Sequence, residues 1–561
     1  MNSLFNRRQL LRGTVAAGVG LALPAWAQPV SAGIRSALPT VSGEDIELRI
    51  AEQMMMVDGR YSHAIGINGT VPAPLVRLRE GQNVRLKIFN TLDEDSSLHW
   101  HGLIVPTQFD GVPGISFPGI PARSSFTYEF PVRQAGTYWY HSHSGLQEQI
   151  GLYGPIVIDP AGVDPTVSDR EHVIVLSDHS QLHGHEMYRK LKLQGGYYNR
   201  QKQTLAGLLA GRDQKPAERV EWGAMRMDPT DIGDVTGSAY TYLVNGNGPQ
   251  DNWTGLFKPG ERVRLRFINA SAMTTFNVRI PGLKLSIVQA DGLNVRPVEV
   301  EEFQFGPAET YDVIVQPVED RAYTLVGESI DRSGMARATL APRAGMVAAV
   351  PPLRTRPVAT MKDMGMDMSG MSGMHDMDMS MRNFDNGPNV ARNPGVQTLS
   401  PMAVDRTGYP GQGLEDVGHK VLTYRDLVAV DRNPDVRAPG RAIDIHLTGN
   451  MERYMWSFDG VKFSDASEPI AFTQGERVRV TLVNDTMMGH PIHLHGHFFE
   501  LVTGKGEFAP RKHTVLVQPG GRVSFDLTAD AIGDWAFHCH MLYHMHAGMM
   551  RVVSVRPAVA A

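Results

Sequence analysis

Gly475-Glu-Arg-Val-Arg-Val-Thr-Leu-Val-Asn484 is a stretch in which apolar and polar side chains alternate behind a glycine. Alternation with a period of two predicts a β-strand that buries one face. The same pattern occurs as Gly81-Gln-Asn-Val-Arg-Leu-Lys-Ile-Phe-Asn90 and as Gly260-Glu-Arg-Val-Arg-Leu-Arg-Phe-Ile-Asn269. Three copies of one strand indicate three related β domains. A chain of 561 residues is also too long for a single hydrophobic core.

The rest of the chain favours an all-β fold. Short apolar stretches separated by Gly and Pro, with few helical patterns, predict Greek-key β-sandwiches. We expect these domains over residues 40–165, 166–345 and 401–561. Residues 346–400 contain prolines and a polar, glycine-rich tract with nine methionines, which favours a linker or surface loop over a packed domain.

The N-terminus has the composition of an export signal. Residues 1–27 contain Arg7, Arg8 and Arg12 but no acid, then an apolar run and the small-residue pattern Ala25-Trp-Ala27. The paired arginines favour the twin-arginine route, which delivers folded proteins to the periplasm. A membrane anchor is the alternative, but the apolar run is shorter than the ~20 residues that a bilayer requires.

The net charge of the chain bears on which partners it could bind. Loss of the three signal arginines leaves 51 basic against 59 acidic residues and changes the net charge from −5 to −8. A mildly acidic protein is poorly suited to nucleic acid. No later stretch is long and apolar enough to cross a bilayer, so we expect a mature protein without a membrane span. The sequence carries no signal for its oligomeric state.

Four His-x-His pairs predict a metal cluster. Side chains two apart on a strand share a face, so each pair presents two imidazoles to one site. A single such pair is more often an ordinary core or surface feature. Four of them in two matching repeats favour metal binding. The pairs are His99/His101, His141/His143, His493/His495 and His538/His540.

Cys539 is the only cysteine, and it lies between two of these histidines. Its side chain must point to the opposite face of the strand, towards a second site. His490, His544 and Met549 are close by in the sequence, and two histidines, a thiolate and a thioether are the ligand set of a blue copper site. The alternative is an inert buried cysteine. A copper on Cys539 could pass electrons through that residue to its two histidine neighbours.

The repeats differ in their metal-binding positions. The stretch Gly136 to His143 matches Gly533 to His540, but Ser142 stands where the third repeat has its cysteine. Gln147 and Leu152 stand at the positions of His544 and Met549, which predicts that the first domain has no blue copper. In the middle repeat Val278 and Ile280 replace the histidine pair. We therefore expect the second domain to be a spacer without copper ligands.

With these motifs the chain resembles a multicopper oxidase. The signatures are His99-Trp-His-Gly102, His141-Ser-His143, His490-Pro-Ile-His-Leu-His-Gly496 and the stretch from His538 to Met549. The resemblance implies three cupredoxin-like domains, four copper ions, and four one-electron oxidations coupled to reduction of O2 to water. It assigns His490, Cys539, His544 and axial Met549 to type 1 copper, His99 and His493 to type 2, and His101, His141, His143, His495, His538 and His540 to the type 3 pair.

Within that family the chain resembles the periplasmic copper-resistance branch of the CopA/PcoA type. The resemblance rests on the export signal, the methionine tract and the stretch from Asn450 to Gly460, and it implies oxidation of Cu(I) and often of phenols. Soft thioethers also favour Cu(I) on chemical grounds. A flexible linker without a metal role is the less favoured alternative for the tract, because methionine is an unusual choice for a mere spacer. Met487 and Met488 are either core packing or a cuprous docking point. The candidate Cu(I) recruitment residues are Met361, Met364, Met366, Met368, Met371, Met374, His375, Met377, Met379, Met381, Met487 and Met488.

Proton delivery to the cluster is the least defined part of the site. Asp110 resembles the carboxylate that assists water formation, while an ordinary Asp-Gly turn is the alternative. No carboxylate lies between His538 and Arg551, where relatives often have one. Glu148 and His546 are candidates to replace it.

Three functional hypotheses follow. The first is a cuprous oxidase that serves copper resistance. The second is a laccase-like phenol oxidase, which predicts an open apolar cleft at His490 and His544. The third is a periplasmic copper-binding or storage protein, disfavoured because storage needs no such array of ligands. A nitrite reductase is disfavoured because the second site has ligands for three coppers instead of one.

Overall fold

The computed structural model describes residues 38–366 and 380–558. The predicted export signal therefore lies outside the described residues. So do the candidate recruitment residues Met368, Met371, Met374, His375, Met377 and Met379.

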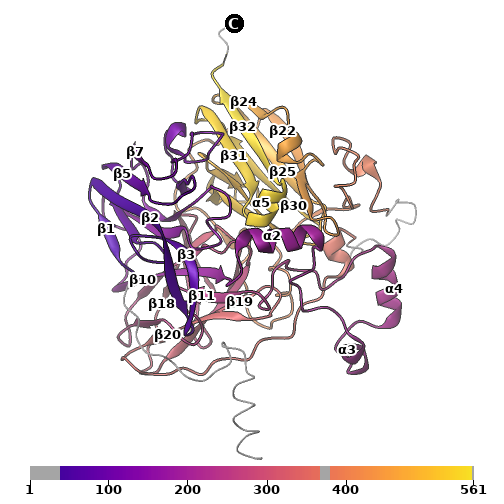
Figure 1. Cartoon of the computed structure of the whole chain (residues 1–561), viewed down its shortest axis with the longest axis horizontal. Coiled ribbons are helices and arrows are strands. Elements are labelled where there is room, and N and C mark those ends of the chain that lie inside the picture. The colour runs from indigo at the N-terminus through magenta and orange to yellow at the C-terminus, as the bar shows by residue number, and fades with distance from the viewer. Residues whose placement is uncertain (1–37, 367–379, 559–561) are drawn as a thin grey trace, which may run out of the picture.

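The described chain folds into six β-sheets that follow one another in three pairs, coloured from indigo to yellow in Figure 1. We call these pairs the first, second and third sandwich. The prediction of an all-β fold is confirmed, because helices are few and short in the described ranges.

The first sandwich consists of a sheet with the order β1-β4-β9-β8-β6 and a sheet with the order β3-β2-β5-β7. Its strands are β1 (Thr40–Ser42), β2 (Asp45–Val57), β3 (Arg60–Ile67), β4 (Leu75–Arg79), β5 (Asn83–Asn90), β6 (His99–His101), β7 (Ser125–Pro131), β8 (Gly136–His141) and β9 (Tyr153–Asp159).

The second sandwich pairs a sheet of order β11-β10-β13-β18-β15-β16 with one of order β12-β20-β19-β14-β17. Its strands are β10 (Arg170–His179), β11 (Thr241–Val244), β12 (Thr254–Leu256), β13 (Val263–Asn269), β14 (Phe276–Arg279), β15 (Leu285–Ala290), β16 (Leu293–Val300), β17 (Glu302–Phe305), β18 (Thr310–Val315), β19 (Tyr323–Ser329) and β20 (Met335–Ala341).

The third sandwich pairs a sheet of order β23-β22-β25-β30-β27-β28, with β21 beside β30, and a sheet of order β24-β32-β31-β26-β29. Its strands are β21 (Val404–Asp405), β22 (Arg441–Asn450), β23 (Met455–Phe458), β24 (Ile470–Thr473), β25 (Arg477–Asn484), β26 (His490–Leu494), β27 (Phe499–Leu501), β28 (Arg511–Lys512), β29 (Thr514–Val517), β30 (Gly521–Thr528), β31 (Gly533–Cys539) and β32 (Met550–Arg556).

The three sequence repeats occupy equivalent places in the three sandwiches. Strands β5, β13 and β25 each pair in parallel with an earlier strand of their sandwich, namely β2, β10 and β22. On the other side each pairs antiparallel, with β7, β18 and β30. Alternating burial along β5 follows directly from the alternating sequence, because successive side chains point to opposite faces.

Each repeat ends in an asparagine for a structural reason. The Nδ2 atoms of Asn90, Asn269 and Asn484 all donate to carbonyl oxygens of the loop that follows. Their Oδ1 atoms accept from the backbone N–H two residues on. An asparagine side chain can thus replace backbone partners and close the turn. In the third sandwich this loop leads directly to His490.

Strand register brings the histidine pairs together. In the first sandwich β6 pairs antiparallel with β8 and places His99 opposite His141. In the third, β26 pairs with β31 and places His493 opposite His538. Rings from the two sandwiches then meet across their interface, as with His141 and His540, whose centroids are 4.9 Å apart.

The helices are α2 (Gly184–Leu193), α3 (Leu205–Leu209), α4 (Pro216–Ala224) and α5 (Leu542–Ala547), with 3-10 turns η2 (Thr107–Phe109), η3 (Met361–Met364), η4 (Phe384–Asn386), η5 (Tyr424–Asp426), η6 (Phe463–Asp465) and η7 (Gly506–Phe508). Figure 1 shows α2 against α5, while α3 and α4 project from one side. Tyr188 of α2 packs on His546 of α5 with ring centroids 4.7 Å apart. Among the described residues no helix has the length and apolarity needed to span a membrane.

Candidate metal centres

Cys539 lies at the end of β31 and is completely buried with two histidines. Its Sγ is 3.6 Å from Nδ1 of His490 and 3.9 Å from Nδ1 of His544, and these two nitrogens are 3.3 Å apart. Met549 is buried as well, and its carbonyl accepts from the Cys539 backbone N–H. The structure therefore brings together the residues that the sequence predicted for a blue copper site.

The far sides of these imidazoles are held by hydrogen bonds. Nε2 of His490 lies 2.7 Å from Oγ1 of Thr486, and Nε2 of His544 lies 2.7 Å from Oδ2 of Asp234. The Asp234 contact places the proton of His544 on Nε2 and leaves a lone pair on Nδ1, aimed at the cysteine. Trp456 stacks on His544 with ring centroids 3.9 Å apart and closes the site.

Burial raises the pKa of the metal-free Cys539 thiol well above its usual range. Burial also lowers the pKa of His544 to about 3, so the imidazole is neutral at physiological pH. A soft cation would exchange the thiol proton for a bond to the thiolate, and neutral imidazoles are ready to bind it. The donor set therefore fits copper.

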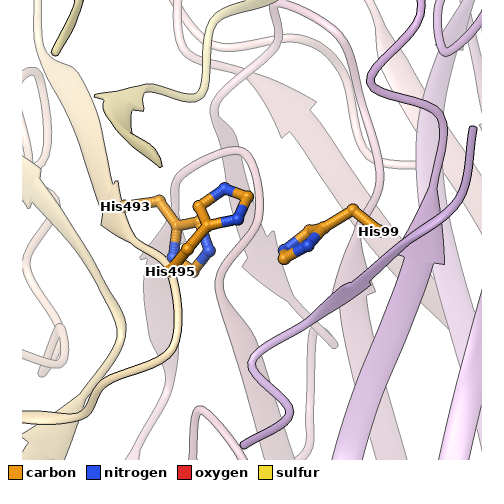
Figure 2. Close-up of side chains that lie close together, drawn as sticks. All are labelled: His99, His493 and His495. Atoms are coloured by element: carbon orange, nitrogen blue, oxygen red, sulfur yellow. The ribbon is translucent and has the colours of Figure 1, made fainter. Parts of the chain in front are cut away.

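The eight paired histidines form a second centre between the first and third sandwiches. Figure 2 shows His99 from the first sandwich pointing at His493 and His495 from the third. Groups of three imidazoles there have ring nitrogens within 4.8 Å of one another, including His99 with His101 and His141, and His143 with His495 and His538.

The direction of each ring nitrogen tests whether this centre fits a metal. Nδ1 of His495 lies 2.9 Å from an Asp110 carboxylate oxygen, and Nδ1 of His538 lies 3.0 Å from the Cys539 carbonyl. Both protons therefore reside on Nδ1. The two Nε2 lone pairs then face each other at 3.1 Å, which is repulsive unless a cation lies between them. Nε2 atoms of His141 and His540 face each other in the same way at 3.3 Å.

Four more ring nitrogens of the paired histidines are buried without a hydrogen-bond partner among the described residues: Nε2 of His99, Nδ1 of His101, Nε2 of His143 and Nε2 of His493. His101 differs from the other three, because its Nε2 lies 3.3 Å from the Thr514 hydroxyl and its Nδ1 is the free atom. Buried polar atoms in native proteins normally have partners. Their convergence fits a cluster of metal ions.

Burial lowers the pKa of all the inner histidines whose shift is resolved. For His141, His143 and His495 the pKa falls well below its usual value, first because burial disfavours a charged ring and second because neighbouring imidazoles repel. Neutral imidazoles are the form that binds metal.

Two carboxylates touch the cluster from outside. Asp110 is fully buried, and besides holding His495 it accepts from Nδ1 of His99 through its backbone oxygen at 2.7 Å. Its contacts thus extend beyond an ordinary turn. Glu148 lies with Oε2 2.7 Å from Nδ1 of His141, and burial raises its pKa well above the usual value. His546, the other candidate, is an exposed residue of α5, and its ring packs on Tyr188.

Strand β31 links the two centres as the alternation of side chains predicted. Cys539 faces the first centre, and its neighbours His538 and His540 face the second. The carbonyl of Cys539 also accepts from Nδ1 of His538 at 3.0 Å. The backbone bonds from Cys539 to its two neighbours are one short connection between the centres, and this hydrogen bond is a second.

The described methionines of the tract lie in a cluster that the sequence did not predict. Met487 packs there with Trp222 and Ala359, and the methionines of this methionine cluster are Met225, Met227, Met361, Met364, Met366, Met381, Met451 and Met487. Met488 instead lies in the main core, which favours packing for that residue. The motif Met225-Arg-Met227 was the signal available in the sequence for the additional members.

Comparisons with known proteins agree with this geometry. Three family models, each described as multicopper oxidase, match residues 49–162, 172–347 and 437–559. The copper resistance protein A homolog of Pseudomonas syringae pv. tomato is 48% identical over 98% of this chain and 99% of its own length. The copper resistance protein A of Escherichia coli is 47% identical over 98% and 99% of the two chains.

Solved structures show the fold. The laccase from Botrytis aclada aligns with a TM-score of 0.63 at 20% identity, covering 95% of this chain and 92% of that one. A multicopper oxidase from Campylobacter jejuni, described as a metallo-oxidase, aligns with a TM-score of 0.61 at 19% identity, covering 96% and 97%. The predicted set of three cupredoxin-like sandwiches is confirmed.

Proposed function

The chain belongs to the multicopper oxidase family, in the branch of the copper resistance A proteins, and from this premise we propose that it oxidises Cu(I) with O2 as electron acceptor. As a family member it is an oxidoreductase that uses copper and oxygen. The observation that carries the choice of Cu(I) is a cavity of thioethers and carboxylates beside the buried cysteine site.

This cavity has a volume of about 380 Å³. Three thioethers and three carboxylates line it, namely Met227, Met451, Met487, Asp228, Asp231 and Glu452. The exposed residues Gly223 and Arg226 also line it, so it opens to the surface. Lys202 and Arg226 line it as well, and Arg226 pairs with Glu452 at 3.0 Å, so the three carboxylates outnumber the two cations. Thioethers are soft ligands that favour Cu(I), and the excess of carboxylate attracts a cation.

Two short stretches of chain connect the cavity to His544. Asp231 is three residues before Asp234, whose Oδ2 lies 2.7 Å from Nε2 of His544. Met451 is three residues before Tyr454, whose hydroxyl donates to the same Asp234 oxygen at 2.8 Å. An electron that leaves a cation in the cavity therefore has a hydrogen-bonded route to the copper ligand.

A phenol is less well accommodated at this site. The laccase-like hypothesis predicts an open apolar cleft at His490 and His544, but both side chains are 0% exposed. Trp456, Asp234 and Tyr454 cover His544, and all three are buried. An aromatic substrate cannot reach the imidazole edge without moving them.

For the metal sites we propose the assignment that the resemblance implied. Type 1 copper would bind His490, Cys539, His544 and Met549. Type 2 copper would bind His99 and His493, and the type 3 pair would bind His101, His141, His143, His495, His538 and His540. Four coppers so bound supply one-electron oxidation at type 1 and four-electron reduction of O2 to two waters at the cluster. The chain's own residues orient the imidazoles, exclude water and, through Asp110 and Glu148, accept hydrogen bonds from cluster ligands.

Copper resistance follows as the physiological role, because Cu(II) is the product and the named relatives are copper resistance proteins. Export to the periplasm through the twin-arginine route rests on the N-terminal pattern. A storage role explains the methionine cluster but not the strand that joins two metal centres.

The test is a triple substitution in the cavity, Met227→Leu, Met451→Leu and Met487→Leu. Leucine keeps the volume and costs less than about 1.5 kcal/mol per site, but it removes the thioether. We expect kcat/KM for Cu(I), measured as oxygen uptake, to fall about tenfold or more, which corresponds to about 1.4 kcal/mol. Oxidation of a substituted phenol should change little.

Met335→Leu is the matched control, because Met335 is a buried methionine in β20 of the second sandwich. It should alter neither substrate. Unchanged Cu(I) oxidation in the triple variant, or equal loss for Cu(I) and the phenol, would refute the cavity as the entry site.

The cavity also predicts a pH effect. Burial raises the pKa of Asp231 to about 6, the hydrogen bond from Asn199 opposes that rise, and repulsion from Asp234 adds to it. Below about pH 6 this carboxylate is protonated and no longer attracts a cation. We expect KM for Cu(I) to rise as the pH falls through this range, and Asp231→Asn to have a high KM that is flat over the same range.

A further inference from the structure

The second sandwich contacts the centre formed by the eight paired histidines, although it supplies none of them. We call this the trinuclear centre, because it would hold the type 2 copper and the type 3 pair. Val278 and Ile280, at its matching positions, are buried apolar residues. Its Asp291, however, reaches the segment Lys512 to Thr514 of the third sandwich. That segment lies directly behind two of the histidines.

Asp291 makes three contacts with this segment. Its Oδ2 accepts from the backbone N–H of His513 at 3.2 Å and of Thr514 at 3.1 Å. Its Oδ1 forms an ion pair with Nζ of Lys512 at 3.0 Å. Asp291 is itself tied down, since its backbone N–H and Oδ1 both bond to Thr310.

The other side of the segment touches the cluster histidines. The carbonyl of His513 accepts from Nδ1 of His493 at 2.8 Å. The hydroxyl of Thr514 lies 3.2 Å from the same Nδ1 and 3.3 Å from Nε2 of His101. These contacts turn Nε2 of His493 and Nδ1 of His101 inward, and the two rings stack with centroids 3.8 Å apart.

The contact between Asp291 and this segment includes buried charges, which are costly to remove from water. Lys512 is 0% exposed, and it also pairs with Glu309 of the second sandwich at 3.2 Å. An apolar cluster of the same volume is often at least as stable as a buried ion pair, so stability alone does not explain these charges. Burial by itself raises the pKa of Asp291, but the attraction of Lys512 outweighs it and holds the pKa below the usual value.

We propose that Asp291 is a positioning residue for the trinuclear centre. From the sandwich without copper ligands, it holds the 512–514 backbone so that His493 presents Nε2 and His101 presents Nδ1 to the metals. The second sandwich thereby orients one ligand proposed for type 2 copper, His493, and one proposed for the type 3 pair, His101, which makes it more than a spacer.

The test compares Asp291→Ala with Asp291→Asn in copper-loaded protein. Alanine removes every contact to the segment. Asparagine tolerates the left-handed backbone at this position (φ 47°) and still accepts a backbone N–H. We expect Asp291→Ala to lower type 2 copper affinity about 10–100-fold, seen as loss of the type 2 signal in electron paramagnetic resonance, with the blue absorbance retained. Asp291→Asn should recover most of that signal.

Glu500→Ala is the matched control. Glu500 forms a buried ion pair with Arg477 at 2.9 Å in the third sandwich, without contact to a cluster histidine. Its loss should lower the melting temperature but leave the type 2 signal unchanged. If Asp291→Ala loses blue and type 2 copper in parallel, as a merely destabilised protein would, or keeps the type 2 signal intact, the proposal is overturned.

A second variant covers the case in which Asp291→Ala does not fold. Thr514→Val keeps the shape of the side chain and removes only the hydroxyl between His493 and His101. We expect a changed hyperfine splitting of the type 2 signal and weaker binding of that copper. A spectrum identical to that of the parent protein would contradict the role assigned to the segment.

Discussion

The first and third sandwiches carry the same strand and loop, yet only the third brings a cysteine and two histidines together at the end of that strand. At the end of β31, Cys539 meets His490 and His544. At the end of β8, the matching residue Ser142 donates instead to Oε1 of Gln147 at 2.9 Å. Leu152, at the position of Met549, is buried in the apolar core. The positions that match Cys539 and Met549 are thus occupied by a hydrogen-bonded hydroxyl and an apolar side chain.

Hydrogen bonds fill the space in the first sandwich. Oε1 of Gln147 also accepts from Ser96 at 2.7 Å, and its Nε2 donates to Glu94 at 2.8 Å. The next residue in the loop, Glu148, reaches His141. Gln147 and Glu148 thus make this loop a polar brace for the neighbouring cluster. The matching loop of the third sandwich carries His544, which Asp234 of the second sandwich contacts.

Cys539→Ser makes the third sandwich resemble the first and should have the largest effect. A hydroxyl is a poor ligand for copper of the blue type, so the thiolate bond through which an electron would enter the backbone between His538 and His540 is lost. We expect blue absorbance and oxidase turnover to fall to background while the type 2 signal persists. Turnover that survives in this variant would show that electrons take a path other than β31.

Asp234→Ala removes the carboxylate that contacts His544 in the loop of the third sandwich. Outer hydrogen-bond partners of metal-bound histidines usually contribute about 10–100-fold to affinity or activity. We expect kcat/KM for Cu(I) to fall by that factor, because His544 loses its partner and the cavity loses its connection. Steady-state oxygen uptake measures this loss, and Asp331→Ala, which alters another buried aspartate of the second sandwich, should leave it unchanged.

Glu148→Ala tests the brace in the first sandwich. Loss of the contact to Nδ1 of His141 should weaken type 3 copper binding about tenfold, measured as copper per protein after dialysis against a chelator. Glu148→Gln retains an oxygen that can accept from the same Nδ1, so its copper content should stay near that of the parent protein. Equal copper loss in both variants would mean that the charge, and not the hydrogen bond, is required.

Gln147→Ala should have the smallest effect on function. It leaves the hydroxyls of Ser142 and Ser96 and the Glu94 carboxylate without their partner, which costs about 1–3 kcal/mol for a buried polar group. Denaturant unfolding should report that loss of stability. Copper content and turnover per copper should be unchanged, and a fall in either would mean that the brace acts on the cluster as a whole.

Local patterns predicted the fold and which side chains gather at the two centres. The repeat at Gly81, Gly260 and Gly475 predicted three related sandwiches, because an alternating strand has the same periodicity in any context. The His-x-His pairs predicted two-residue contributions to one face for the same reason. Cys539 between two histidines predicted the opposite face.

No local sequence pattern predicted the contacts that surround the two centres. Asp234 lies in an insertion without repeats, and 310 residues separate it from His544. Asp291 lies 222 residues from His513. The methionine cluster gathers residues from four segments, around Met225, in the tract, at Met451 and at Met487, of which only the tract stood out by composition. Contacts of this kind depend on how loops pack after the sandwiches have formed.

The sequence by itself determined which side chains share a strand face, and hence that a thiolate and two imidazoles serve different centres, because strand geometry is local. Only the tertiary structure decided that Asp234 covers His544, that a thioether cavity adjoins it, and that Asp291 holds the back of the cluster. Those placements arise from the packing of three sandwiches against one another. Contacts between residues far apart in the chain produce no periodic pattern in the sequence.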